Sequence, residues 1–268
     1  GPCMSAKTVW ITGASSGIGE ALALQFAKNG DRLVLSARRE DELERVAKRC
    51  RAAAGTGTGQ VLVLPLDVTD WDSLPGKVEA VLAQFGTIDL LVNNAGVSQR
   101  SLCKDTDMSV YQKLMDVDVM GQIALTKEVL PHMLERGSGH LAVTSSVAGK
   151  VGAPMRTGYC AAKHAVMGFF DALRAEVEGQ GVSVSTITPG FIRTNISRNA
   201  LAGDGSAYGK EDEDIAGGMD VTECAEVVFK GLEAKKREIP VGKGKEMAAL
   251  WIKRISPEAL FRMARARS

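Results

Sequence analysis

Short apolar runs recur along this chain, and longer amphipathic stretches separate them. Most of the runs are continuously apolar and do not alternate with polar residues, which is typical of parallel strands buried on both faces. The predicted strands are Thr8–Thr12, Arg32–Ser36, 61–66, 88–92, 140–144, 182–188 and a last short one near Ile239.

The stretches between these strands have helical spacing. In one of them, Leu43, Val46, Ala47 and Cys50 recur on one helical face. The predicted helices are 39–54, 71–85, 109–136, 157–178 and 222–236. Strand–helix alternation without a repeat or a linker predicts one α/β domain over residues 1–268. We expect a Rossmann-type doubly wound parallel sheet with helices on both faces.

Two segments do not fit the alternation of strands and helices. Residues 194–220 are rich in Gly, Ser, Asn and Asp and follow a strand end, where lids over substrate sites commonly occur. We therefore expect a substrate lid there.

Residues 245–268 form a basic amphipathic tail. Its apolar residues are Leu250, Trp251, Ile255, Leu260 and Phe261, and its basic residues include Lys253, Arg254, Arg262, Arg265 and Arg267. The tail is interpreted either as a helix packed on the domain or a partner subunit, or as a peripheral contact with an anionic membrane.

Composition narrows the class of protein. The 33 basic and 32 acidic side chains leave a net charge of +1, which gives no electrostatic footprint for nucleic acid. The cysteines are scattered and odd in number (Cys3, Cys50, Cys103, Cys160 and Cys224), which favours a reduced, intracellular protein, cytoplasmic or membrane-associated. His132, His140 and His164 show no metal-ligand spacing, so we expect no metal site.

A glycine-rich segment follows the first predicted strand and opens a helix. It contains Gly13, Ser15, Ser16, Gly17, Ile18 and Gly19. Glycines let the backbone turn tightly and approach a pyrophosphate, while a helix N-terminus presents unpaired N–H groups to the phosphates. In this strand–loop–helix context the segment predicts a dinucleotide site.

The end of the second predicted strand indicates which dinucleotide binds. Enzymes that use NAD usually place an acidic residue there to hold the ribose 2′-hydroxyl. This chain instead has Ala37 followed by Arg38 and Arg39, and guanidinium groups pair well with a 2′-phosphate. We therefore predict NADP(H). The alternative is that both arginines are solvated residues at the start of a helix.

Tyr159 and Lys163 lie four residues apart on a predicted helix, so they share a face. A tyrosine with an ordinary pKa of about 10 is a poor base at neutral pH, but a nearby ammonium stabilises its phenolate. Tyr159 can then exchange a proton with a carbonyl or alcohol oxygen. Ser146, which follows the fifth predicted strand, could hydrogen-bond the same oxygen, with neighbouring Ser145 as its rival.

These motifs together resemble the short-chain dehydrogenase/reductase family. The resemblance covers nearly the whole chain and rests on the glycine segment, Asn93-Asn94-Ala95-Gly96, Ser146, Tyr159 and Lys163, in that order. It implies that Pro189, Ile192 and Thr194 belong to a nicotinamide-binding loop. It also implies that Asp67 and Val68 contact the adenine, that Asn94 lines the cofactor cleft, that Lys163 holds the nicotinamide ribose, and that the protein is a homodimer or homotetramer.

One residue departs from the family pattern. Asp118 stands where the family commonly has an asparagine that helps hold a proton-relay water. Aspartate keeps the shape but changes the hydrogen-bonding inventory and adds charge. If it is ionised beside Lys163, it partly cancels the charge that stabilises the Tyr159 phenolate and favours reduction over oxidation; if it is protonated or faces away, it only fills the space.

The finer resemblance is to the branch that contains dehydrogenase/reductase member 7B, which implies an apolar or lipid-like carbonyl substrate. The sequence therefore predicts an NADP(H)-dependent oxidoreductase that acts on a carbonyl or secondary alcohol. A sugar-nucleotide epimerase is disfavoured by the spacing of Gly13 and Gly17. The alternative of a different class is a non-catalytic NADP-binding regulatory protein.

Overall fold

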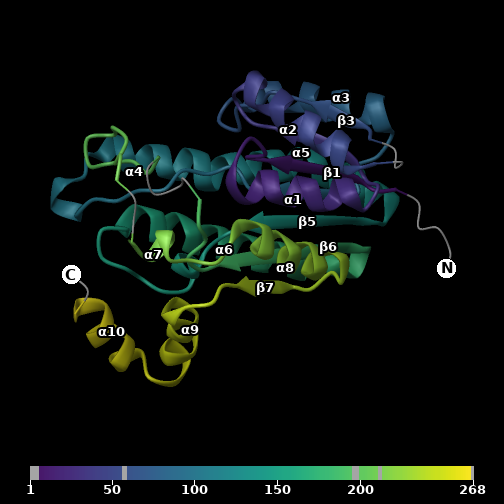
Figure 1. Ribbon diagram of the computed structural model, residues 1–268. Helices are drawn as coiled ribbons and strands as arrows, with labels where there is room; N and C mark the ends of the chain where they lie inside the picture. The colour runs from purple at the N-terminus through teal and green to yellow at the C-terminus, as the bar shows by residue number, and fades with distance from the viewer. Residues whose placement is uncertain (1–5, 56–58, 195–198, 211–212, 267–268) are drawn as a thin grey trace.

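A single parallel sheet organises the computed structural model, which describes residues 6–55, 59–194, 199–210 and 213–266. Within that part of the chain the sheet has seven strands in the order β3-β2-β1-β4-β5-β6-β7, and every neighbouring pair is parallel (Figure 1). The strands are β1 (Thr8–Thr12), β2 (Arg32–Ser36), β3 (Val61–Val63), β4 (Leu90–Asn93), β5 (Gly139–Thr144), β6 (Val182–Pro189) and β7 (Glu238–Val241). The predicted doubly wound fold is confirmed.

Helices cover both faces of the sheet. One face carries α1 (Gly17–Lys28), α2 (Glu40–Ala53) and α8 (Val221–Glu233), and the other carries α3 (Leu74–Phe85), α5 (Gly121–Arg136) and α6 (Thr157–Val177). Strand β1 serves both cores, since Val9 and Ile11 pack with the first group of helices and Trp10 with the second. This two-sided burial explains why the strand sequences are continuously apolar.

The predicted strand 61–66 is shorter in the structure, where β3 ends at Val63, and Pro65 lies at a position whose nitrogen faces the open edge of the sheet. Its neighbours still bond to β2, with the Leu64 N–H donating to Leu35 O (2.9 Å) and the Leu66 N–H to Ala37 O (2.9 Å). The chain therefore stays beside the sheet as far as Asp67, at the edge where β2 ends.

The predicted helix over 109–136 is continuous in the structure from Met108 to Arg136, but it contains an irregular turn that the sequence pattern did not predict. The structure has α4 (Met108–Met115), a π-helical turn η3 (Asp116–Met120) and then α5. Such turns are rare and occur mostly at functional sites. Here Asp118 Oδ1 accepts the Val97 N–H (2.7 Å), and Gly121 packs so closely on Val68 that a Cβ atom would overlap it. These two tertiary contacts fix the turn, and neither has a periodic sequence signal.

The basic tail forms α9 (Lys245–Ile255) and α10 (Pro257–Ala266), which project below β7 in Figure 1. Leu260 is buried against Val147 and Val151, so one face of the helix pair packs on the domain. Two other residues that we expected on its apolar face, Trp251 and Ile255, are 64% and 81% exposed. Among the described residues, no helix has the length and apolar character that crossing a bilayer requires.

The predicted lid segment lies partly against the chain that follows β4. The Leu201 N–H donates to Ser98 O (2.8 Å) and the Arg100 N–H donates to Leu201 O (2.9 Å). The short helix α7 (Glu213–Ala216) follows. Residues 195–198 and 211–212 of this segment lie outside the described residues, as do Cys3 and Arg267.

Phe170 is fully buried in the core between the sheet and α6, whereas Phe261 on α10 is 56% exposed. We expect Phe170→Ala to lower the free energy of unfolding by about 3–5 kcal/mol, because it removes a buried ring and leaves a cavity. Phe261→Ala is the control and should change it by about 0.5 kcal/mol or less. Urea unfolding of both variants measures this, and similar losses would contradict the core assignment.

Candidate active site and nucleotide cleft

The sequence-predicted site residues gather at one edge of the sheet, where the carboxyl ends of its parallel strands meet. The segments after β1, β2, β4, β5 and β6 carry them, and α6 adds Tyr159 and Lys163. Ligands of open α/β sheets bind at this edge. The observed strand order therefore converts residues scattered along the chain into one cleft.

The glycine segment forms a backbone cradle at the start of α1. Gly13 has a φ of +61°, and a Cβ atom on it would lie 2.8 Å from Asn94 O. A Cβ atom on Gly19 would collide with the Gly13 carbonyl oxygen. These neighbours are backbone atoms that cannot move aside, so only glycine fits both positions. The cradle leaves the N-terminus of α1 open to an anionic group such as a pyrophosphate.

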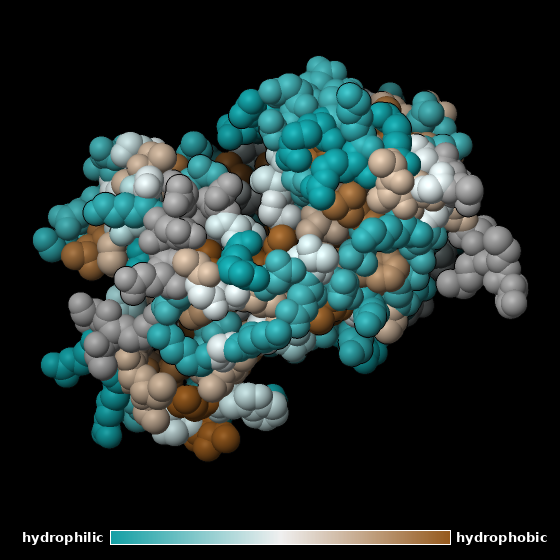
Figure 2. Space-filling model, viewed as in Figure 1, coloured by the Kyte–Doolittle hydropathy of each residue, from teal (hydrophilic) through white to brown (hydrophobic). Residues whose placement is uncertain are grey.

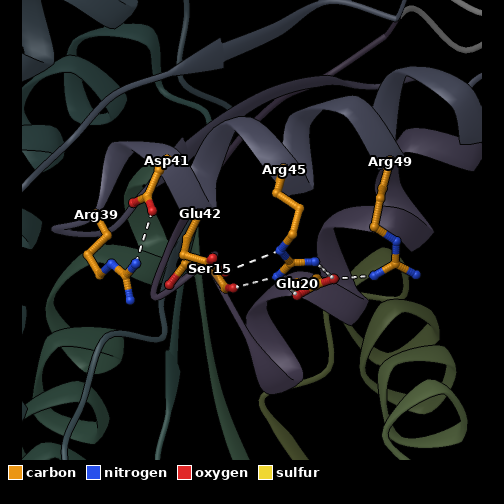
Figure 3. Close-up of polar contacts among 7 residues, drawn as sticks. All are labelled: Ser15, Glu20, Arg39, Asp41, Glu42, Arg45 and Arg49. Atoms are coloured by element: carbon orange, nitrogen blue, oxygen red, sulfur yellow. Dashed lines mark hydrogen bonds and ion pairs between the residues drawn. The ribbon is translucent and has the colours of Figure 1, made fainter.

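An ion-pair network braces this cradle from α2, as Figure 3 shows. The Arg45 guanidinium donates to Ser15 O (3.1 Å) and to both carboxylate oxygens of Glu20 (2.8 and 3.1 Å), which Arg49 also contacts. Burial alone would raise the pKa of Glu20, but the hydrogen bonds and charges of Arg45 and Arg49 lower it. Sequence reasoning missed this brace because nothing in the local pattern sets Arg45 apart from other surface arginines.

The two arginines after β2 differ in their surroundings. Arg39 is exposed and pairs with Asp41 (2.9 Å; Figure 3). Arg38 is exposed and has no hydrogen bond or ion pair with any described residue. Asp67 lies close enough that the Arg38 charge contributes to the low pKa of its carboxyl group, after the larger effect of the hydrogen bonds from Thr69. Arg38 is thus the guanidinium that is available at this end of the cleft.

Asn93 and Asn94 have separate structural roles. Asn93 is buried, and its amide donates to Thr126 Oγ1 (3.0 Å) and Ala142 O (3.3 Å). Asn94 donates from its side chain to Gly13 O (3.3 Å) and from its backbone to Thr12 Oγ1 (3.0 Å). Asn94 therefore ties the loop after β4 to the glycine cradle, as a cleft-lining residue must, while Asn93 holds the core.

Tyr159 and Lys163 are both largely buried and lie side by side. The Lys163 ammonium donates to Thr144 O (3.1 Å) and lies 5.5 Å from the centre of the Tyr159 ring. Ser145 is buried, and its hydroxyl donates to Lys163 O (3.2 Å). Ser146 is only half-buried, and its Oγ accepts the Ala148 N–H (3.0 Å), which leaves its own proton for another partner. The geometry therefore favours Ser146 over Ser145 as the residue that faces the cleft.

Asp118 lies beside Lys163, as the sequence hypothesis requires. Its Oδ1 and the Lys163 Nζ are 3.3 and 3.7 Å from the point where a Cβ atom on Gly96 would sit. Burial raises the pKa of Asp118 to about 6, while the Lys163 charge and the Val97 N–H oppose that shift. The carboxyl group is therefore mostly ionised above that pH. Its second oxygen, Oδ2, is buried and has no hydrogen-bond partner among the described residues.

Arg156 is a site residue that sequence reasoning missed. Its guanidinium stacks on the Tyr159 ring, with 4.4 Å from Cζ to the ring centre, and donates to Ser98 Oγ (2.6 Å). It comes three residues before the tyrosine, at the N-cap of α6. The face of the Tyr159 ring therefore carries a second cation, besides Lys163.

The segment after β6 closes the other side of the cleft. Met219 bonds to both neighbours of Ile192, donating to Phe191 O (2.8 Å) and accepting the Arg193 N–H (2.9 Å). In this bridge the N–H and C=O groups of Ile192 itself point away from Met219. Thr194 lies opposite the glycine cradle, with its methyl carbon 3.7 Å from where a Cβ atom on Gly17 would sit.

Comparison with known proteins places these features in context. Residues 7–204 match the model of the family described as short chain dehydrogenase. The human dehydrogenase/reductase SDR family member 7 is 46% identical over 86% of this chain and 68% of its own length. The mouse dehydrogenase/reductase SDR family member 7B is 38% identical over 97% of this chain and 80% of its own length.

Solved structures of other dehydrogenases have a similar fold. A short chain dehydrogenase/reductase from Burkholderia phymatum, in complex with NAD, is 26% identical and superimposes with a TM-score of 0.82 over 95% of each chain. An alcohol dehydrogenase from Thermococcus sibiricus, complexed with 5-hydroxy-NADP, is 28% identical with a TM-score of 0.76 over 89% of this chain and 97% of its own.

Proposed function

This chain belongs to the short-chain dehydrogenase/reductase family, and we propose that it uses NADP(H) to interconvert an apolar carbonyl compound and its secondary alcohol, favouring reduction. Oxidoreductase chemistry with a nicotinamide cofactor follows from the family. The observation that carries the proposed proton transfer to and from the substrate is the buried Lys163 ammonium, 5.5 Å from the centre of the Tyr159 ring at the cleft edge of the sheet.

The contacts along the cleft support this choice of cofactor. The glycine cradle would hold the pyrophosphate, Arg38 the 2′-phosphate, Asp67 and Val68 the adenine, and Ile192 and Thr194 the nicotinamide end. The bound nicotinamide supplies or accepts the hydride. The N–H and C=O groups of Ile192 support this assignment, because the bridge to Met219 uses neither of them and leaves them pointing away from Met219.

Proton transfer is the task of the protein's own residues. Ser146 would donate a hydrogen bond to the substrate oxygen and orient it toward Tyr159. Tyr159 then gives its hydroxyl proton to that oxygen during reduction, or removes the proton during oxidation. Lys163 lies where its charge stabilises the phenolate that remains, and Asp118 tempers that charge.

The surface of α9 and α10 supports an apolar substrate delivered from a lipid phase. Figure 2 shows apolar atoms among hydrophilic ones at this corner, where Trp251, Ile255 and Phe261 are exposed. Arg254, which stacks on the Trp251 ring, and Arg262 are exposed beside them. Apolar groups flanked by cations suit the headgroup region of an anionic membrane, so we propose peripheral membrane contact through this tail. The homodimer or homotetramer remains a prediction.

The test of the proposed activity is a panel of aldehydes, ketones and secondary alcohols with pure protein, in which the absorbance of NADPH is followed. Turnover of any member excludes the alternative of a non-catalytic NADP-binding regulatory protein. Binding of NADPH without any turnover would favour that alternative.

The cofactor preference rests on Arg38 and the absence of an acidic residue at Ala37. We expect NADP(H) to bind at least about tenfold more tightly than NAD(H), or about 1.4 kcal/mol. Ala37→Asp should reduce or reverse the preference by repelling the 2′-phosphate. Arg38→Ala should reduce it more than Arg39→Ala does, because Asp41 already pairs with Arg39. Titration of each protein with both cofactors measures the dissociation constants, and equal values in the unmodified protein would refute the preference.

Tyr159→Phe keeps the ring and removes the proton donor. We expect turnover to fall by about 10²–10⁴-fold while NADPH binding survives. Tyr111→Phe is the matched control, since its hydroxyl only bonds Thr157 Oγ1 (2.8 Å) away from Lys163, and it should keep near-normal turnover. If Tyr159→Phe retains more than about a tenth of normal turnover when chemistry limits the rate, Tyr159 is not the acid.

Asp118→Asn removes a negative charge beside Lys163 and nearly preserves the shape of the side chain. Alcohol oxidation needs the Tyr159 phenolate, and Asp118 is mostly ionised above a pH of about 6. We expect the acidic limb of the oxidation pH profile to move to lower pH by roughly one unit, with a smaller effect on reduction at pH 7. Superimposable oxidation profiles of the two proteins would show that Asp118 exerts no electrostatic bias.

A further inference from the structure

Glu246 is a buried carboxylate that none of the steps above uses. It lies in the first turn of α9 and is only 7% exposed. An acidic residue in the first turn commonly stabilises a helix through its dipole, but that role needs no burial. The side chain of Glu246 is turned inward, across the start of the segment that follows β6.

The carboxylate holds that segment by its backbone. Glu246 Oε1 accepts the Phe191 N–H (3.0 Å), and the preceding residue, Gly190, donates its own N–H to Val241 O (2.8 Å). Phe191 directly precedes Ile192, whose own N–H and C=O groups point away from Met219. Glu246 therefore braces the loop from behind.

Glycines make room for this brace. A Cβ atom on Gly190 or on Gly244 would collide with the carboxylate of Glu246. A Cβ atom on Gly242 would lie 3.1 Å from its Oε1. A side chain enclosed this closely, by three glycines from the ends of β6 and β7, has little freedom to move. The Phe191 N–H of the loop consequently donates to an acceptor that is held in place.

Packing alone does not hold the loop. A cavity of about 210 Å³ lies behind it between described residues, and its lining includes Phe191, Arg193, Met219 and Glu246. Ile192 packs into the core, whereas Phe191 and Arg193 border this space, so hydrogen bonds contribute to the position of the backbone there. On that side Met219 and Glu246 hydrogen-bond the backbone of the loop.

We propose that Glu246 is a positioning residue for the nicotinamide end of the cofactor: from α9 it fixes the loop 189–194 so that Ile192 and Thr194 are ordered before the cofactor arrives. This inference rests on the proposed function, since it takes that loop as the nicotinamide site. Through Glu246, the helix pair α9 and α10 is linked to the nicotinamide half of the cleft and not to the adenosine half. The adenosine half depends on the glycine cradle and Arg38, which Glu246 does not contact.

The test compares two ligands in the full chain. NADPH reaches the loop, whereas adenosine 2′,5′-bisphosphate carries only the adenosine half and the 2′-phosphate. We expect Glu246→Ala to weaken NADPH binding by about tenfold, as loss of a hydrogen bond to a charged group predicts, and to leave binding of the bisphosphate unchanged. Glu246→Asp keeps the charge, shortens the reach and should show the same selective loss if the alanine variant fails to fold.

Two further variants separate positioning from stability. Glu246→Gln keeps an oxygen that can accept from Phe191 and should bind NADPH almost normally. Glu258→Ala removes an exposed glutamate from the first turn of α10 and should change neither affinity. Without ligand, amide hydrogen exchange in the peptide that contains residues 189–194 should be faster in Glu246→Ala and Glu246→Asp than in the other two variants.

The outcomes are distinguishable. Equal losses for NADPH and the bisphosphate in both the alanine and the aspartate variants, or no loss in either variant, would overturn the role of Glu246. A glutamine variant as weak as the alanine variant would also overturn it, because the charge rather than the bond to Phe191 would then matter. If the unmodified protein binds neither ligand, the proposed function itself fails.

Discussion

The buried ammonium of Lys163 is the constraint on which the arrangement of the candidate active site depends. A charge removed from water is costly unless polar groups or an opposite charge surround it. Here the Thr144 carbonyl accepts from it, and the Asp118 carboxylate lies beside it. The face of the Tyr159 ring also lies near it. The same groups that make burial of Lys163 tolerable also place its charge next to the phenol.

Asp118 has two opposed effects in this arrangement. Its negative charge offsets the cost of burying Lys163, and it weakens the positive field at Tyr159. An asparagine would provide less of the first effect and avoid the second. The π-helical turn matters here because the bond from Val97 holds one carboxylate oxygen, so the side chain cannot swing away from the lysine. The departure from the family pattern is thus part of the electrostatics of the site and not a peripheral change.

The sequence predicted the framework of the site well, because backbone requirements leave strong local signals. Gly13 and Gly19 lie where two main-chain segments come too close for any side chain. Strands β1 and β2 have the predicted limits, because strands buried on both faces have continuously apolar sequences. The missed features are bonds between distant side chains. Arg45 reaches Ser15 from another helix, Arg156 stacks on Tyr159, and Glu246 bonds a backbone amide 55 residues away. No periodicity encodes such contacts, and the π turn likewise depends on tertiary packing.

The two halves of the cleft are held by different kinds of contact, and this difference has a consequence for control. The half proposed for the adenosine is held by close main-chain contacts of Gly13 with Asn94 and of Gly19 with Gly13. The half proposed for the nicotinamide is held by two backbone hydrogen bonds with Met219 and by the bond that Phe191 donates to Glu246, and Glu246 belongs to a helix pair whose outer face is exposed. Anything that shifts α9 therefore acts first on the loop 189–194. The adenosine part of the proposed cofactor would then stay bound while the geometry around its nicotinamide changes. The reason is that main-chain packing holds the first part of the cleft, whereas a side-chain hydrogen bond contributes to holding the second.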